Sequence, residues 1–80
     1  MDGVPSASQP DWVLTRRRAI GESIRTARRH ASLTQEAVAL RSGLDRASYN
    51  RIEQGHQSPL LDTLIRIANA IGVPLADLVR

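Results

Sequence analysis

The sequence predicts an all-α protein, a single small domain built from five short helices. Apolar residues recur at intervals of three and four along most of the chain, as they do on one face of a helix. No segment alternates between apolar and polar residues in the way that a half-buried strand does. The chain has 80 residues, of which 41% are hydrophobic, so we expect one core and no second domain.

The first helix is expected from about residue 15 to residue 31. The preceding residues, 1–14, begin with a stretch rich in Gly, Pro and Ser that has no helical period, which predicts a flexible arm. The folded domain is therefore expected at residues 15–80. The apolar stripe of this helix consists of Ile20, Ile24, Ala27 and Ala31.

Two short helices joined by a very short turn are expected next. Thr34 is a good N-cap for a helix at 35–42, because its hydroxyl can accept a hydrogen bond from the first turn. Gly43 ends that helix, since glycine readily takes the left-handed conformation of a helix C-terminus. Asp45 then caps a third helix at 46–54.

Two further helices are expected in the C-terminal part of the chain. After a loop at 55–60, a helix at 61–71 ends at Gly72, and Pro74 opens a short helix at 75–79. The face of the fourth helix that is expected to meet the core contains Leu61, Leu64, Ile65, Ala68 and Ile71.

The second and third helices match the helix-turn-helix motif, whose second helix lies in the major groove of DNA. The motif needs a small residue where the helices cross and a glycine in the turn, and Ala39 and Gly43 meet these demands. A generic helical hairpin is the alternative, but it rarely satisfies every demand at once. The residues expected to lock the two helices are Val38, Leu44, Tyr49 and Ile52.

The charge of the chain is concentrated rather than spread. The net charge is only +3, yet six of the eleven arginines lie in segment 16–29, where Glu22 is the only acidic residue. Such a cluster is typical of a protein with an anionic partner, and equally of a solvated helix face. Charge alone leaves both readings open.

An enzyme is not expected. His30 and His56 are far apart in the sequence, the eight acidic residues show no obvious pairing, and there is no Cys. We therefore expect no metal site and no cofactor. No apolar run approaches the roughly 20 residues that span a bilayer, and the first ten residues lack the pattern of a secretory signal. These observations predict a cytoplasmic protein with no membrane partner.

Three stretches between Ile24 and Leu78 resemble the Cro/XRE repressor family: IRTARRHASLTQEAVA, SGLDRASYNRIEQG and PLLDTLIRIANAIGVPLADL. The resemblance implies a compact five-helix Cro/repressor-like bundle with the helix-turn-helix in its second and third helices. It also implies a nucleoid-associated, sequence-specific transcriptional regulator, with repression the expected effect. Family members usually bind as homodimers to double-stranded DNA that contains a pseudo-palindromic operator.

The resemblance implies two sets of DNA contacts. Base readout is assigned by position to Arg46, Ala47, Asn50 and Arg51 on the third helix. Their chemistry agrees, because Arg can pair with guanine, Asn with adenine, and Ala can touch a thymine methyl group. Phosphate contacts are assigned to Thr34, Gln35, Ser48, His56, Gln57 and Ser58.

Two structural roles also follow from the resemblance. Arg28 and Glu53 match positions that form a partly buried ion pair, whose expected role is to orient the third helix. The C-terminal end is expected to form a two-fold dimer contact, or simply to close the core. The residues assigned to the dimer interface are Ile71, Val73, Leu75, Leu78 and Val79.

The chain departs from the family pattern at three places. Tyr49 replaces an aliphatic residue, so its hydroxyl needs solvent, a phosphate or a polar neighbour. Leu60 replaces a capping Ser or Thr, so the fourth helix is expected to begin weakly. Ala27 replaces a larger residue, and Trp12 is a candidate to fill the space.

The alternative function is a small protein–protein adaptor or antitoxin-type module that reuses the same fold. It predicts no salt-sensitive preference for a DNA sequence. A regulatory protein partner also fits, because no second domain is expected to sense a ligand. The arginines at 16–18 lie outside the matched stretches and are expected to attract phosphates nonspecifically.

Overall fold

The computed structural model describes residues 9–80, and within that range the chain forms five helices and no strand. The predicted all-α fold is confirmed. No helix in the described part is long and apolar enough to cross a membrane. The helices are α1 (Asp11–His30), α2 (Gln35–Ser42), α3 (Arg46–Glu53), α4 (Leu61–Ile71) and α5 (Leu75–Val79).

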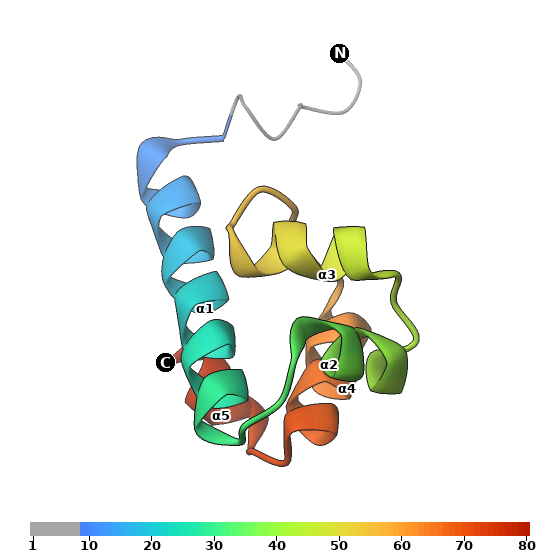
Figure 1. Cartoon of the computed structure of the whole chain (residues 1–80). Coiled ribbons are helices and arrows are strands. Elements are labelled where there is room, and N and C mark those ends of the chain that lie inside the picture. Colours follow the sequence, from blue (N-terminus) through green and yellow to red (C-terminus); the bar gives the residue numbers. More distant parts are fainter. Residues whose placement is uncertain (1–8) are drawn as a thin grey trace.

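The long helix α1 runs along one side of the molecule, and the four shorter helices lie together on the other side (Figure 1). The helix α3 meets the middle of α1, while α5 packs alongside its C-terminal half. The helix α2 lies between α3 and α4 and contacts both of them. This arrangement leaves one long face of α3 uncovered.

The start of α1 differs from the prediction. The helix begins at Asp11 rather than near residue 15, because the carbonyl of Pro10 accepts hydrogen bonds from the backbone N–H groups of Val13 and Leu14. Asp11 also places a negative charge at the positive end of the helix dipole. The last residues of the predicted arm are therefore helical, and residues 1–8 lie outside the described residues.

The predicted turn between α2 and α3 is confirmed in its details. The hydroxyl of Thr34 accepts a hydrogen bond from the N–H of Ala37 at 3.0 Å. The carboxylate of Asp45 accepts one from the N–H of Ser48 at 2.9 Å. Gly43 joins the two helices with a φ of 72°, a left-handed conformation that favours glycine.

The core is aliphatic except for one tyrosine. The residues predicted to lock α2 against α3 lie in it, with Leu44 packed at its edge. As expected, Leu60 precedes α4 without providing a side-chain cap. The buried apolar residues are Ile24, Val38, Ala39, Tyr49, Ile52, Ile67, Ala68, Ile71 and Leu78.

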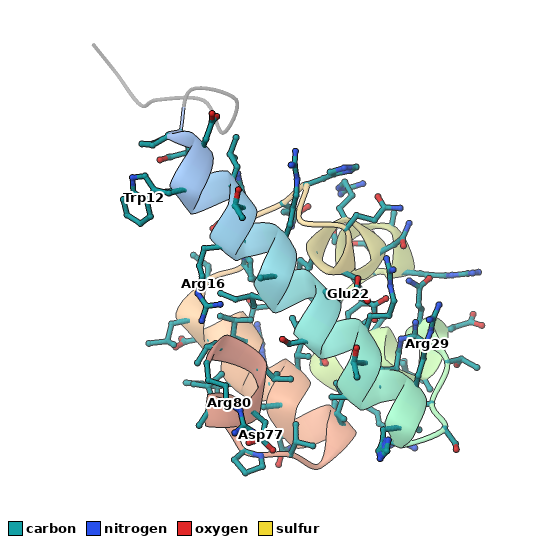
Figure 2. All side chains as sticks on the ribbon, turned by 90° about the vertical axis from the view of Figure 1, so that its left-hand side faces the viewer. Trp12, Arg16, Glu22, Arg29, Asp77 and Arg80 are labelled. Atoms are coloured by element: carbon teal, nitrogen blue, oxygen red, sulfur yellow. The ribbon has the colours of Figure 1, made fainter. Side chains whose placement is uncertain are left out.

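Trp12 does not fill the core beneath Ala27, as suggested from the sequence. Its side chain is 75% exposed and projects from the first turn of α1 (Figure 2). There it borders a surface pocket of about 320 Å³, which Pro59 and Leu64 line on the other side. The first turn of α1 lies far from Ala27 along the helix, which explains the error.

The contact between α1 and α3 depends on a glycine in each segment. A Cβ atom on Gly21 would lie only 2.6 Å from the carbonyl oxygen of Ile52 and closer still to that of Glu53. A Cβ atom on Gly55, just after α3, would lie 2.7 Å from Cγ of Arg18. Glycine therefore lets α1 approach the C-terminal end of α3 closely and fixes the position of that helix.

Candidate nucleic-acid interface

The helix α3 has one buried face and one exposed face. Tyr49, Ile52 and Glu53 are turned inward and are at most 2% exposed. Of the residues predicted to read bases, Ala47 and Arg51 lie on the opposite side, while Arg46 is the first residue of the helix. Arg46, Ala47 and Arg51 are exposed, and Asn50 is partly exposed at the flank.

One of these side chains is already held in place. The Nε atom of Arg51 donates to the side-chain oxygen of Gln57 at 3.0 Å, and its Nη2 atom donates to the hydroxyl of Ser48 at 3.2 Å. The structure thus brings a predicted base reader together with two predicted phosphate contacts. His56 and Ser58, in the same loop, are exposed.

The carboxylate of Glu53 lies at the centre of a buried hydrogen-bond network. It accepts from Arg28 through Nε at 2.7 Å and through Nη2 at 3.2 Å. The hydroxyl of Tyr49 also donates to it, so this tyrosine finds the polar neighbour that it needs. The network ties α3 to α1 from inside the protein.

The hydrogen bonds of this network determine which of its side chains are charged. Burial alone would raise the pKa of the Glu53 carboxyl, but the hydrogen bonds from Arg28, Tyr49 and Gln35 outweigh it and hold the pKa below its usual range. The hydrogen bond to Glu53 raises the pKa of Arg28 despite its burial. Burial, with the neighbouring carboxylate, raises the pKa of Tyr49. The network therefore consists of a carboxylate, a guanidinium cation and a neutral phenol at neutral pH.

Gln35, at the start of α2, is turned into the protein. Its Nε2 atom donates to the side-chain oxygen of Asn50 at 2.9 Å and to Glu53 at 3.0 Å. An amide nitrogen has only two hydrogens, so none remains for a phosphate in this arrangement. The phosphate contact predicted for Gln35 would therefore require this amide nitrogen to leave one of its two partners.

Comparison with known proteins shows which family has this arrangement of helices. A family model described as Helix-turn-helix matches residues 24–78, well over half of the chain. The chain belongs to this helix-turn-helix family of Cro/XRE-type transcriptional regulators.

The relatives of this regulator carry related names. The uncharacterized HTH-type transcriptional regulator y4dJ of Sinorhizobium fredii is 36% identical over 79% of this chain and 82% of its own length. The cryptic phage CTXphi transcriptional repressor RstR of Vibrio cholerae is 43% identical over 70% of this chain. The matched part spans only 50% of that repressor.

Two solved structures share the fold of the regulator. The restriction-modification controller protein C.AhdI from Aeromonas hydrophila superposes with a TM-score of 0.78 at 28% identity, over 80% of this chain and 97% of that one. The clp gene regulator ClgR from C. glutamicum superposes with a TM-score of 0.76 at 24% identity, over 79% and 82% of the respective chains. The second likeness concerns the fold alone.

A basic cleft of about 660 Å³ borders the DNA-binding motif of the regulator, and sequence reasoning did not single it out. Arg25 and Arg29 reach it from α1, and Arg46 from α3. Positions four apart on a helix share a face, so the spacing of Arg25 and Arg29 could have indicated that they lie together. Besides these three, the cleft is lined by Arg28, Thr34, Gln35 and Glu36.

The arginines of α1 do not form one continuous surface patch. Arg29 lies near the C-terminal end of the helix, whereas Arg16 lies beside α5 (Figure 2). Arg16 there donates a hydrogen bond to the backbone carbonyl of Val79. Arg16 is therefore engaged by the C-terminal helix, away from the basic cleft.

The residues assigned to the dimer interface have different surroundings. Leu78 is fully buried and Ile71 is 8% exposed, so both belong to the core of the regulator. Val73, Leu75 and Val79 are partly buried. The large exposed apolar side chains lie elsewhere, and α4 carries two that had been assigned to the core, Leu61 at 63% and Ile65 at 48% exposure.

Metal binding finds no support in the described part of the chain. Residues 9–80 contain no group of three or more His, Asp or Glu side chains close enough to hold an ion.

Proposed function

We propose that this transcriptional regulator binds an operator in double-stranded DNA sequence-specifically, as a homodimer, and represses transcription from it. The observation that carries the proposal is the exposed face of α3. Four side chains suited to base contact stand on it, while a buried ion pair holds the opposite face of the helix against α1. A helix fixed in this way can present the same side chains to every DNA molecule that it meets.

The base contacts follow from the chemistry of that face. Arg46 and Arg51 can each donate two hydrogen bonds to guanine in the major groove. Arg51 enters with its guanidinium already oriented by Gln57 and Ser48, which lowers the entropic cost of the contact. Ala47 is short enough to let a thymine methyl group approach α3.

Phosphate contacts would surround this face. The first backbone N–H groups of α2 follow the exposed Thr34, at the end of the helix where the dipole favours an anion. The loop residues His56, Gln57 and Ser58 follow the other end of α3, with Ser48 at its side. The basic cleft adds Arg25 and Arg29 to the predicted set.

The homodimer is expected to use the exposed apolar side chains of α4. Leu61 and Ile65 are one helical turn apart, and a two-fold axis would bury them against the same residues of a second copy. The partly buried Val73, Leu75 and Val79 are candidates to extend the contact. Two copies of α3 about 34 Å apart would then read a pseudo-palindrome.

The relatives favour a repressor over an activator. One relative is named a phage transcriptional repressor, so repression by a protein of this family has precedent. Such a protein acts on the nucleoid, in the cytoplasm. A protein–protein adaptor or antitoxin-type module stays the alternative, and it requires no sequence preference on DNA.

Binding to the DNA upstream of the gene that encodes the regulator tests the proposal. The native fragment should be preferred over a shuffled one by at least about 10³-fold, and affinity should fall steeply between about 50 and 200 mM salt. Arg46→Ala or Arg51→Ala should abolish the preference and leave weak, salt-sensitive binding. Arg80→Ala, a matched change beside α5 (Figure 2), should preserve it.

The two failures have different meanings. Equal, weak binding to both fragments would mean that the operator lies elsewhere in the genome. Selection from random DNA would then identify its sequence. No binding at low salt would contradict the proposal and favour the protein–protein module.

A further inference from the structure

A chain of hydrogen bonds leads from the buried ion pair to the DNA-facing side of α3. Arg28 donates to Glu53, Gln35 donates to Glu53, and Gln35 also donates to Asn50. The carboxylate of Glu53 is buried, whereas Asn50 is partly exposed between the predicted base readers Arg46 and Arg51. The chain therefore connects the interior of the protein to a side chain that reads bases.

The ion pair fixes the direction of every hydrogen bond in this chain. Arg28 can only donate, because a guanidinium has no acceptor and does not lose its proton in proteins. Glu53, as its carboxylate partner, can only accept. The atom of Gln35 that lies 3.0 Å from Glu53 must then be the amide nitrogen.

The same argument passes on to Asn50. The amide nitrogen of Gln35 lies 2.9 Å from the Asn50 side chain and uses its second hydrogen there. The atom of Asn50 that receives this hydrogen must be the carbonyl oxygen Oδ1. Its amide nitrogen, Nδ2, is consequently turned away from Gln35, and no hydrogen bond within residues 9–80 engages it.

We propose that Gln35 is a positioning residue for base specificity: it holds Asn50 with its amide nitrogen outward, so the regulator selects guanine over adenine at the base that Asn50 contacts. Guanine offers two acceptors in the major groove, N7 and O6, which suit an outward NH2 group. Adenine offers N7 but also a donor, N6, whose usual asparagine partner is the carbonyl oxygen, and here that oxygen is directed toward Gln35. This preference reverses the asparagine–adenine pairing expected from the sequence, and it rests on the proposed function.

Selection of binding sites from a random pool of double-stranded DNA tests the inference with the full chain. The Asn50→Ala variant identifies the base that Asn50 contacts, because the base preference should disappear at that one position of the selected DNA site and nowhere else. At this position the unmodified regulator should select guanine over adenine by roughly ten-fold, the size of one good base contact. Selection of adenine there would overturn the inference.

Two variants separate positioning from mere structural support. Gln35→Met keeps the length of the side chain but has no donor, so Oδ1 of Asn50 is released and adenine should rise to within about three-fold of guanine. Asn50→Asp keeps the hydrogen bond from Gln35 but presents only acceptors, so the preferred base should change to cytosine, whose N4 group donates. The control Gln9→Met makes the same chemical change at the start of α1 and should leave the selected site unaltered.

Unfavourable outcomes point to different conclusions. If Gln35→Met weakens binding equally for all sites and leaves the guanine preference intact, Gln35 does not set specificity and the inference is wrong. If Asn50→Asp still selects guanine, the outward donor is not what reads the base. If the unmodified regulator enriches no sequence from the pool, the proposed function itself fails.

Discussion

The guanidinium of Arg28 holds the carboxylate of Glu53 at two points, with Nε 2.7 Å from Oε2 and Nη2 3.2 Å from Oε1. Arg28 belongs to α1 and Glu53 to the last turn of α3, so the pair joins the longest helix to the helix that carries the predicted base readers. Both residues are at most 9% exposed. Each charge therefore depends on the other for the solvation that water no longer supplies.

Removing the charge of Glu53 should destabilise the protein strongly. Glu53→Gln keeps the shape of the side chain but leaves the Arg28 cation without its counter-ion, which should lower the free energy of unfolding by about 3 kcal/mol. Denaturation by urea measures the change. The control Glu22→Gln removes an exposed partner of Arg25 and should cost less than about 0.5 kcal/mol. Equal losses in the two variants would contradict a special role for the buried pair.

The same carboxylate should make stability depend on acid. Because folding lowers the pKa of Glu53, its contribution is complete above the ordinary glutamate pKa and is lost as the pH falls from there through the lower pKa of the folded state. The free energy of unfolding should therefore fall between about pH 5 and pH 3. In Glu53→Gln this fall should be smaller, and parallel curves for the two proteins would show that other groups cause it.

The local elements of this fold could be predicted because their causes lie within a few residues. Thr34 and Gly43 determine where α2 begins and ends, Asp45 determines where α3 begins, and the structure confirms each of them. The start of α1 was missed because Pro10 and Asp11 adjoin a stretch whose composition favours an irregular arm. There the two local signals disagree, and the backbone hydrogen bonds to Pro10 decide the outcome.

The features that the sequence did not predict have a tertiary origin. Helical spacing places Leu61 and Ile65 near the core-facing residues of α4, but only packing determines how wide a face is covered. The Gln35 amide is used up by Asn50 and Glu53, which lie in a different helix, and no sequence spacing reports such a contact. The close contact at Gly21 could not be predicted either, because a glycine in a helical sequence does not indicate which backbone will pack against it.

Gly21 should tolerate no side chain. In Gly21→Ala the new Cβ atom would meet the carbonyl oxygens of Ile52 and Glu53, which are backbone and cannot rotate away. The helices must then separate, and we expect a loss of about 2 kcal/mol in the free energy of unfolding together with weaker DNA binding. Gly43→Asn is the control, since its Cβ meets nothing within 4 Å and asparagine accepts the left-handed conformation. A thermal melt that ranks Gly43→Asn below Gly21→Ala would be evidence against this account.

The cap of α2 should contribute to stability separately from DNA binding. Thr34→Ala removes the oxygen that accepts from the N–H of Ala37 and should cost about 1 kcal/mol in urea denaturation. Thr34→Ser retains the hydroxyl and should keep most of that stability. If Thr34→Ala leaves stability unchanged but weakens DNA binding, the hydroxyl acts on the phosphate and not on the helix.

The exposed apolar side chains of α4 should control dimerisation. Leu61→Asp places a charge in the proposed two-fold contact, yet its position in the first turn of α4 suits an acidic residue, so the monomer should stay folded. Sedimentation should then show a shift from dimer to monomer, and affinity for a two-half-site operator should fall by about 100-fold or more because two linked contacts become one. Affinity for a single half-site should barely change. Leu40→Asp alters a still more exposed leucine on α2 and should leave the dimer intact. A dimer that is lost in Leu40→Asp but kept in Leu61→Asp would place the interface on α2 instead of α4.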